Sequence, residues 1–423
     1  MTILVLLAAH GAIPAIGSED SAVEQFRKRR DELRAALPDG ITVLFGRTEK
    51  DSDDLRSGFF QEPNFYYLSG WSEPGAILLL APGPRNALPK EILFIPKRSP
   101  EQEKWTGPKK GPEDPEIRGI TGFETVLAAE SFESELGRML QEYPRIYTLA
   151  GSRRAANLRT LAPLREVADA TTAIARLRMK KSPQELTLIE RATEATLAAH
   201  RAAWKRIAPG LFEYQIAATM SETYLEQGCE RAAYAPIVAA GPNATTLHYS
   251  NNRRRMDAGE LLLMDVGAEC AGYAADITRT VPVNGKFSKR QKELYNIVLG
   301  AQQAVIAAVK PGMMLGKSSP NSLYQIAYDY LNTHGKDLHG EPLGKYFTHG
   351  VSHHIGLEVH DAFAPNVALE AGMVITVEPG LYIPEEKIGI RIEDMVLVTA
   401  DGSRVLSAGL PRDPEAIEKA LAK

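Results

Sequence analysis

The chain has 423 residues, of which 44% are hydrophobic and 24% charged, a composition that predicts a folded protein of two or three domains. Its formal net charge of -4 and the lack of a long run of one sign argue against nucleic-acid binding. Two cysteines, Cys229 and Cys270, exclude a disulfide framework, although these two could form one pair.

The first 17 residues, MTILVLLAAHGAIPAIG, are a possible signal-like segment. Their apolar stretch is too short to span a bilayer, and the Lys or Arg that normally precedes a signal's apolar core is absent. The alternative is a frayed terminus or a short buried strand, so the chain is expected to be either cytoplasmic or exported. Nothing else in the sequence resembles a membrane span, and no membrane partner is expected.

Residues 18–176 are predicted to form an α/β domain. The segment VEQFRKRRDELRAAL, which starts at Val23, predicts an amphipathic helix, and ITVLFG predicts a strand. In FFQEPNFYYLSGWSEPGAILLLAPG we expect a strand, a turn and a further buried strand, and KEILFIP predicts another strand bounded by proline.

Residues 177–423 are predicted to form an α+β catalytic domain. Capping boxes mark the starts of two long helices, one at Ser182 with Glu185 and one at Ser288 with Gln291. Strands are expected in ELLLMDVG, AADITRTVPV, MVITVEPG and IGIRIEDMVLVT. Strands grouped with long flanking helices favour α+β organisation.

Two carboxylates stand where a strand should be buried. Asp265 ends the apolar run LLLM, and Asp276 lies on the returning strand. If the hairpin is centred between Cys270 and Ala271, these two residues face each other, with Cβ atoms roughly 4.5–5.5 Å apart. One or two divalent cations bound between the two carboxylates would offset their repulsion. The alternative is that each carboxylate makes only local hydrogen bonds.

Two more carboxylates lie at strands that are expected to be buried. Glu378 follows an apolar strand, and Glu393 shares a strand face with Arg391. A structural ion pair between Arg391 and Glu393 is the alternative for that strand. Four carboxylates together match the charge of two divalent ions. Carboxylates with an imidazole suit Mn, Co, Fe or Zn, and the predominance of oxygen favours Mn.

The imidazole comes from the segment THGVSHHIGLEVHD, residues 348–361, which holds four of the nine histidines. Its glycines, Gly350 and Gly356, favour a loop or short strand over a helix. The chain has no HEXXH motif, no P-loop, no G-x-G-x-x-G and no G-x-S-x-G nucleophile elbow, which disfavours the competing chemistries.

Read in order, these residues resemble the five-ligand dinuclear site of the pita-bread metallopeptidases, the family of methionine aminopeptidase, aminopeptidase P and prolidase. The segments LHYSNN, HGVSHHIGLEVHD, TVEPGLY and GIRIED are similar to its motifs, and LFGRTEKDSDD with FFQEPNFYYLSGWSEP is similar to the N-terminal domain of aminopeptidase P. The resemblance implies a pita-bread (creatinase/aminopeptidase) catalytic domain preceded by an α/β creatinase-like domain. It also implies the following metal ligands: Asp265, Asp276, His353, Glu378 and Glu393.

Further roles follow from the same resemblance. Asp276 and Glu393 would bridge two divalent ions, most simply Mn²⁺, and Glu378 would also transfer a proton. The remaining matches are histidines that contact substrate or stabilise the oxyanion (His248, His349, His360), a supporting network (Tyr382, Arg391) and an N-domain acid (Asp54). His354 has no such role. The chain departs from the family at Phe60-Gln61, where Arg-Gln is usual, which puts the match of Asp54 in question.

The resemblance implies a homo-oligomeric Xaa-Pro aminopeptidase, a dimer or a tetramer, acting on peptides with proline in second position. A prolidase, which cleaves Xaa-Pro dipeptides, is the nearest alternative. A metal-free creatinase-like enzyme and a non-catalytic peptide-binding module are further alternatives, and the complete ligand set argues against both.

Overall fold

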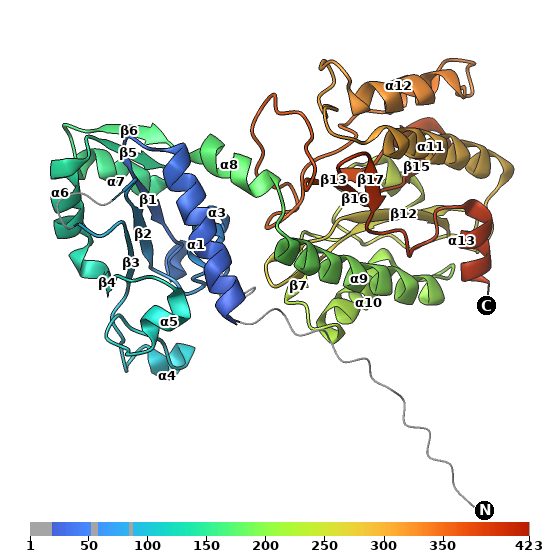
Figure 1. The fold of residues 1–423 in the computed structure, drawn as a ribbon. Coiled ribbons are helices and arrows are strands. Elements are labelled where there is room, and N and C mark those ends of the chain that lie inside the picture. The colour runs from blue at the N-terminus through green and yellow to red at the C-terminus, as the bar shows by residue number, and fades with distance from the viewer. Residues whose placement is uncertain (1–18, 52–57, 84–87, 423) are drawn as a thin grey trace, which may run out of the picture. The chain divides into compact units, whose positions relative to one another are not determined.

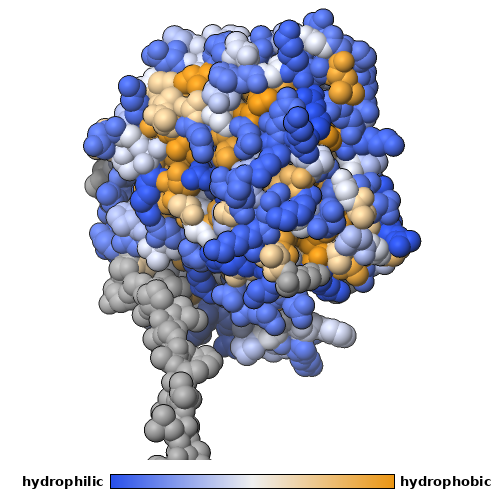
Figure 2. Space-filling view, turned by 90° about the vertical axis from the view of Figure 1, so that its right-hand side faces the viewer, coloured by the Kyte–Doolittle hydropathy of each residue, from blue (hydrophilic) through white to orange (hydrophobic). Residues whose placement is uncertain are grey.

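The computed structural model describes residues 19–51, 58–83 and 88–422, and the chain divides into two compact units, Met1–Ile174 and Ala175–Lys423 (Figure 1). The signal-like segment 1–17 and the predicted site residue Asp54 lie outside the described residues. Among the helices in these ranges, none combines the length and the apolar character that a membrane crossing requires. Hydrophilic side chains predominate on the face drawn in Figure 2, where apolar side chains gather in separate areas.

The N-terminal unit is built on one six-stranded mixed sheet in the order β4-β3-β2-β1-β5-β6. β1 pairs antiparallel with β2 and parallel with β5, so the sheet changes direction at its centre. Its strands are β1 (Ile41–Phe45), β2 (Ile77–Leu80), β3 (Glu91–Ile95), β4 (Val126–Ala128), β5 (Arg145–Thr148) and β6 (Glu166–Asp169). Its helices are α1 (Glu19–Ala36), α3 (Pro63–Ser69), α4 (Glu103–Thr106), α5 (Ile117–Thr121), α6 (Phe132–Glu142), α7 (Arg153–Leu161) and α8 (Thr171–Met179), the last of which crosses into the second unit.

The strand expected at the start of FFQEPNFYYLSGW was wrong, because this segment contains helix α3. The carboxylate of Glu62 caps the helix by accepting a hydrogen bond from the N–H of Phe65, and Pro63 occupies the first turn. Gly70 ends the helix in the left-handed region, with φ of 67°. These end signals outweigh the strand preference of the aromatic residues between them.

The C-terminal unit contains four longer helices and a short final one. α9 packs against α10, and α11 packs against α12, while α9 also covers β10 and β11 and α11 contacts β13 to β15. Both predicted capping boxes are confirmed, at Ser182 for α9 and at Ser288 for α11. The helices are α9 (Pro183–Arg206), α10 (Glu213–Glu226), α11 (Lys289–Ala308), α12 (Leu323–Thr333) and α13 (Pro414–Leu421).

The strands of this unit form small antiparallel sheets, in the orders β11-β10-β7, β12-β9-β8, β13-β16-β17 and β14-β15. The four predicted strand segments are confirmed within them. The strands are β7 (Arg231–Ala232), β8 (Ile237–Ala240), β9 (Leu261–Val266), β10 (Ala268–Cys270), β11 (Tyr273–Ala274), β12 (Ile277–Pro282), β13 (Val374–Val377), β14 (Gly380–Ile383), β15 (Ile388–Arg391), β16 (Asp394–Val398) and β17 (Ser403–Val405).

The predicted register of the hairpin that carries Asp265 and Asp276 was wrong, because the centre of its turn lies one residue further along the chain than expected. Cys270 pairs with Tyr273, so the turn is centred between Ala271 and Gly272, and Asp265 lies opposite Thr278 rather than Asp276. Both turn residues have positive φ, 50° for Ala271 and 79° for Gly272. A two-residue turn of this kind matches the twist of the strands. Because alanine rarely adopts positive φ, this turn could not be predicted from the residues that form it.

The two cysteines are joined. A disulfide links Cys229, two residues before the edge strand β7, to Cys270 at the end of β10, with a Cα–Cα distance of 4.3 Å. It therefore fastens the hairpin that leads to Asp276.

Candidate metal centre

Interruptions in the strands bring the predicted acids into one cavity of about 530 Å³. Asp276 occupies the break between β11 and β12, Glu393 the break between β15 and β16, and Glu378 the step between β13 and β14. His353 belongs to the irregular segment 348–361, as expected from its glycines. The lining includes all five predicted ligands together with His248, His349, His360, Arg391, Tyr234, Ile237, Leu247 and Val359.

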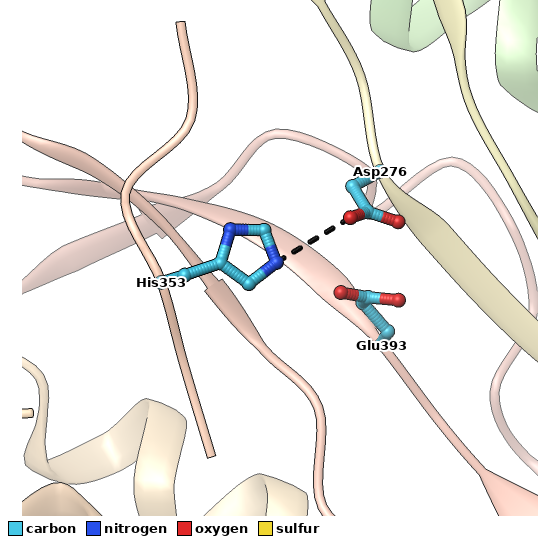
Figure 3. Close-up of side chains that lie close together, drawn as sticks. All are labelled: Asp276, His353 and Glu393. Carbon is cyan, nitrogen blue, oxygen red and sulfur yellow. Dashed lines mark ion pairs between the residues drawn. The ribbon is translucent and has the colours of Figure 1, made fainter. Parts of the chain in front are cut away.

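Three predicted ligands form the centre of the cavity. One donor atom from each of Asp276, His353 and Glu393 lies within 4.8 Å of the others, and Figure 3 shows the imidazole directed toward the two carboxylates. The Nε2 of His353 is 3.4 Å from Asp276 Oδ2 and 3.4 Å from Glu378 Oε1. Its Nδ1–H donates to the carbonyl of His354, which leaves Nε2 for the acidic side. This is the orientation in which histidine usually binds a metal.

The charges of this centre call for a cation. Burial, followed by repulsion from Asp276 and Glu378, raises the pKa of Glu393 well above its usual value. Burial and the neighbouring Asp265 likewise raise the pKa of Asp276. Burial raises the pKa of Glu378 to about 7. Buried oxygen donors that repel one another, together with one imidazole, fit divalent metals of the Mn, Fe or Zn type.

The same acids change the pKa of His353. Burial alone would lower the pKa of its ring, but Asp276 and Glu378 outweigh burial and raise it to about 9. In this arrangement the protonated imidazole takes the place of a cation between the carboxylates.

Asp265 lies on the flank of the centre. Its Oδ1 accepts a hydrogen bond of 2.6 Å from the Tyr234 hydroxyl, which also contacts Asp276, and its Oδ2 forms an ion pair with Arg391. Burial favours the protonated form of Asp265, but Arg391 and Tyr234 hold its pKa below the usual value. The alternative pairing of Arg391 with Glu393 is not what the structure contains, since Arg391 turns to Asp265.

A chain of hydrogen bonds runs from Arg391 to the histidine segment. Arg391 donates to the Tyr382 hydroxyl at 2.7 Å, and Tyr382 donates to His349 Nε2 at 2.8 Å. The Nδ1–H of His349 then donates to the carbonyl of Gly350 at 2.7 Å. Burial and the charge of Arg391 lower the pKa of His349 to about 3, so its ring is neutral.

The other predicted histidines are placed as follows. His248 and His360 line the cavity, and the ring of His360 lies 4.3 Å from that of His353. Burial and the charge of His353 lower the pKa of His360. His354, which was given no role, is buried and bridges to Ile375 outside the cavity lining.

Three hydroxyl groups that hold these acids were not predicted from the sequence. Tyr234 joins Asp265 to Asp276, as described above. Thr278 Oγ1 donates to Glu393 at 2.6 Å and accepts from Arg391 Nε. Thr376 Oγ1 donates to Glu378 at 3.2 Å. The two threonines lie two residues from an acid, where period-two spacing could have indicated them, whereas Tyr234 left no sequence signal.

Two glycines allow the backbone segments around the centre to approach closely. A Cβ added to Gly267 would lie 1.7 Å from the carbonyl oxygen of Ala275, the residue before Asp276. A Cβ added to Gly389 would lie 1.8 Å from the oxygen of Ala244. A side chain at Gly267 would push β9 and β10 away from the segment that carries Asp276, and one at Gly389 would push β15 away from the short helical turn at Ala244.

The fold and this acidic cavity together define a metallopeptidase. The chain belongs to metallopeptidase family M24, which it matches over residues 187–400, and residues 26–147 match the aminopeptidase P N-terminal domain. The expected fold class, a pita-bread catalytic domain preceded by that N-terminal domain, is thereby confirmed.

Individual relatives agree over nearly the whole chain. The Xaa-Pro aminopeptidase of Haemophilus influenzae is 34% identical, with 94% of this chain and 97% of that protein covered. An aminopeptidase P from Pseudomonas aeruginosa has a similar structure, with a TM-score of 0.85 at 30% identity over 94% of this chain and 98% of the other. Aminopeptidase P from Escherichia coli, solved with the inhibitor Pro-Leu, gives a TM-score of 0.83 at 30% identity with the same coverage.

Proposed function

We propose that this chain is a dinuclear-metal Xaa-Pro aminopeptidase, which hydrolyses the bond between an N-terminal residue and a following proline. The observation that carries the proposal is the buried cavity in which Asp276, His353 and Glu393 converge, with Asp265 and Glu378 beside them. The similarity to proteins named Xaa-Pro aminopeptidase over 94% of the chain supports the same activity.

The proposed cofactor is a pair of divalent ions, with manganese favoured by the oxygen-rich donors. Asp276 and Glu393 would bridge the pair, Asp265 would complete the shell of one ion, and His353 with Glu378 that of the other. Bound ions would supply Lewis acidity, which polarises the scissile carbonyl and lowers the pKa of a water molecule.

The side chains of the protein would move the proton and hold the substrate. Glu378, whose carboxylate lies 3.4 Å from His353 in the cavity, can accept a proton from the attacking water and pass it to the departing prolyl nitrogen. His248 and His360, on the cavity wall, would face the substrate carbonyl as it becomes an oxyanion. Arg391 and Tyr382 position Asp265 and His349 through the hydrogen bonds described above.

Selection of proline fits the lining of the cavity. The bond before proline has no N–H, so a site that requires a backbone donor at that position would reject it. Ile237, Leu247 and Val359 give the cavity an apolar wall, against which a pyrrolidine ring can pack.

Steady-state assays on matched peptides test the proposed specificity. We expect turnover of Xaa-Pro-Xaa-Xaa peptides and loss of turnover when alanine replaces the proline. Activity confined to Xaa-Pro dipeptides would identify a prolidase instead.

Substitution of the proposed base tests the mechanism. Glu378→Gln keeps the size of the side chain but removes its charge, so kcat should fall by a factor of about 10²–10⁴. Glu370→Gln is the matched control, because Glu370 pairs with Lys180 at the surface. Equal rates in the two variants would reject Glu378 as the base.

Metal analysis separates the enzyme from a non-catalytic peptide-binding module. We expect two ions per chain, lost together with activity on chelation and restored by Mn²⁺. Full activity in a demonstrably metal-free preparation would overturn the proposal.

The remaining assignments are proposals of the same kind. We take residues 1–17 as a possible signal-like segment, 18–176 as the aminopeptidase P N-terminal domain and 177–423 as the catalytic domain. Asp54 is proposed to bind substrate, in which case Asp54→Asn should raise KM. A homo-oligomer, a dimer or tetramer, stays a prediction that light scattering of the purified protein can check.

A further inference from the structure

His248, which the proposed function places beside the substrate carbonyl, lies in the loop of residues 246–254, which contains no helix or strand. Its exposed side chain lines the cavity together with Leu247 and Ser250 of the same loop. Within the described residues, the imidazole of His248 makes no hydrogen bond of its own. The position of the ring in the cavity therefore depends on how the backbone of this loop is held.

One buried carboxylate holds the loop. It belongs to Glu213, which is the first residue of α10 and is completely buried. Its Oε1 accepts from the backbone N–H of Ala240 at 2.8 Å and from Asn243 Nδ2 at 3.0 Å. Its Oε2 accepts from the Tyr249 hydroxyl and from the backbone N–H of Arg254, both at 2.8 Å. The carboxylate thus joins the end of β8 to the loop, which it holds directly after His248 and again at its last residue.

A second side chain attaches the same loop to β8. The Oδ1 of Asn252 accepts from the N–H of Val238 at 3.0 Å, and its Nδ2 donates to the carbonyl of Pro236 at 2.8 Å. Asn252 has a φ of 51°, a conformation that asparagine tolerates better than most residues. Because β8 pairs with β9, where Ile237 lies opposite Asp265, the loop is fixed to the strands beside the acids.

We propose that Glu213 is a positioning residue for the peptidase reaction, whose carboxylate holds His248 in place through Tyr249 and the backbone of Arg254. The inference rests on the proposed function, because it assumes that His248 meets the substrate carbonyl. A carboxylate suits this place because it can accept all four hydrogen bonds, whereas the NH₂ group of glutamine can only donate. A small displacement of a catalytic group can cost a large part of the rate.

Tyr249→Phe is the mildest test, because it removes one hydroxyl and leaves the ring, which packs against the apolar cluster around Ile237. On Xaa-Pro-Xaa-Xaa peptides with excess Mn²⁺, kcat/KM should fall about tenfold. Metal affinity in a chelator competition should not change, since none of the proposed ligands lies on the loop. Tyr214→Phe is the matched control, because this exposed tyrosine is the neighbour of Glu213 and should keep the rate of the unaltered protein.

Glu213→Gln should lower kcat/KM further than Tyr249→Phe, because it disturbs both attachments of the loop. If the glutamine variant does not fold, Tyr249→Phe still decides the matter.

A double-variant cycle distinguishes positioning from a general structural role. In a His248→Ala background, Tyr249→Phe should change kcat/KM by less than about twofold, because the hydroxyl acts through an imidazole that is no longer present. A loss of about tenfold in both backgrounds would show that the hydroxyl acts independently of His248 and would overturn the proposal.

The ring signals of the nine histidines provide a measurement that needs no turnover. In zinc-loaded protein labelled with ¹⁵N, which avoids the line broadening caused by Mn²⁺, His248→Ala assigns the His248 signal. Glu213→Gln and Tyr249→Phe should both shift this signal, while that of His334, next to the end of α12, stays in place.

Three further results would overturn the proposal. They are a His248 signal that neither variant moves, equal kcat/KM in Tyr249→Phe and Tyr214→Phe, and a loss of metal affinity that accounts for the whole loss of rate. Absence of Xaa-Pro turnover in the unaltered protein would instead overturn the proposed function, and the ring signals would still show whether Glu213 positions His248.

Discussion

Removal of the disulfide between Cys229 and Cys270 should cost the protein a calculable amount of stability. The bond closes a loop with a sequence separation of 41 residues. In the chain-entropy treatment, a loop of this length restricts the unfolded chain by about 4 kcal/mol at 25 °C. Dividing this free energy by the unfolding entropy expected for a unit that runs from Ala175 to Lys423 gives a decrease of about 8 °C in Tm.

Scanning calorimetry of the metal-loaded protein can measure this loss. The double variant Cys229→Ala/Cys270→Ala should melt about 8 °C below the oxidised protein. A reductant should lower the Tm of the unaltered chain and leave the variant unchanged. A thiol count on denatured protein confirms which state was melted. If complete reduction leaves Tm where it was, the disulfide does not constrain the unfolded chain and the reasoning fails.

Three further predictions concern the metal centre. Gly267→Ala should lower the free energy of unfolding by about 3 kcal/mol or more, because the added Cβ meets a backbone oxygen. Gly137→Ala is the control, because a Cβ at Gly137 meets open space and should not lower this free energy. Equal denaturant midpoints in the two variants would contradict the prediction. Thr278→Val should weaken metal affinity by about 10- to 100-fold in a chelator competition, since it frees Glu393 and Arg391; unchanged affinity would argue against this support. Metal-free protein should lose stability from about pH 5 to pH 9. Folding raises the pKa of Glu378 to about 7 and that of His353 to about 9, so the folded state binds these protons more tightly than the unfolded state does. The stability that this proton binding contributes is lost as the pH rises past each of these pKa values. Melting temperatures that stay level over this pH range would refute the prediction.

Structural features that are determined by residues close together in the sequence could be predicted. Features that depend on contacts with distant residues could not. The long helices starting after Ser182 and Ser288 were predicted because each capping box lies within four residues. Helix α3 was missed because its aromatic residues favour strands, while its cap at Glu62 and its end at Gly70 are single residues. The hairpin register depended on Ala271 adopting a positive φ that alanine seldom takes.

The candidate site shows the same division. Its acids could be recognised singly, because a carboxylate at the end of an apolar strand is unusual wherever the strand packs. Which partner each acid takes could not be recognised, since Asp265 meets Arg391 and Tyr234 only when two separate sheets and the loop between β7 and β8 have come together. The pairing of the two cysteines depended on tertiary structure for the same reason.

The close approach at Gly267 and Gly389 limits how the specificity of this protein could be engineered. At both positions a larger residue would separate backbone segments that lie against each other, Gly267 from Ala275 and Gly389 from Ala244. The apolar wall formed by Ile237, Leu247 and Val359 carries no such restriction, because it consists of side chains that face the cavity. Variation aimed at a new substrate should therefore be confined to the wall, with both glycines held constant.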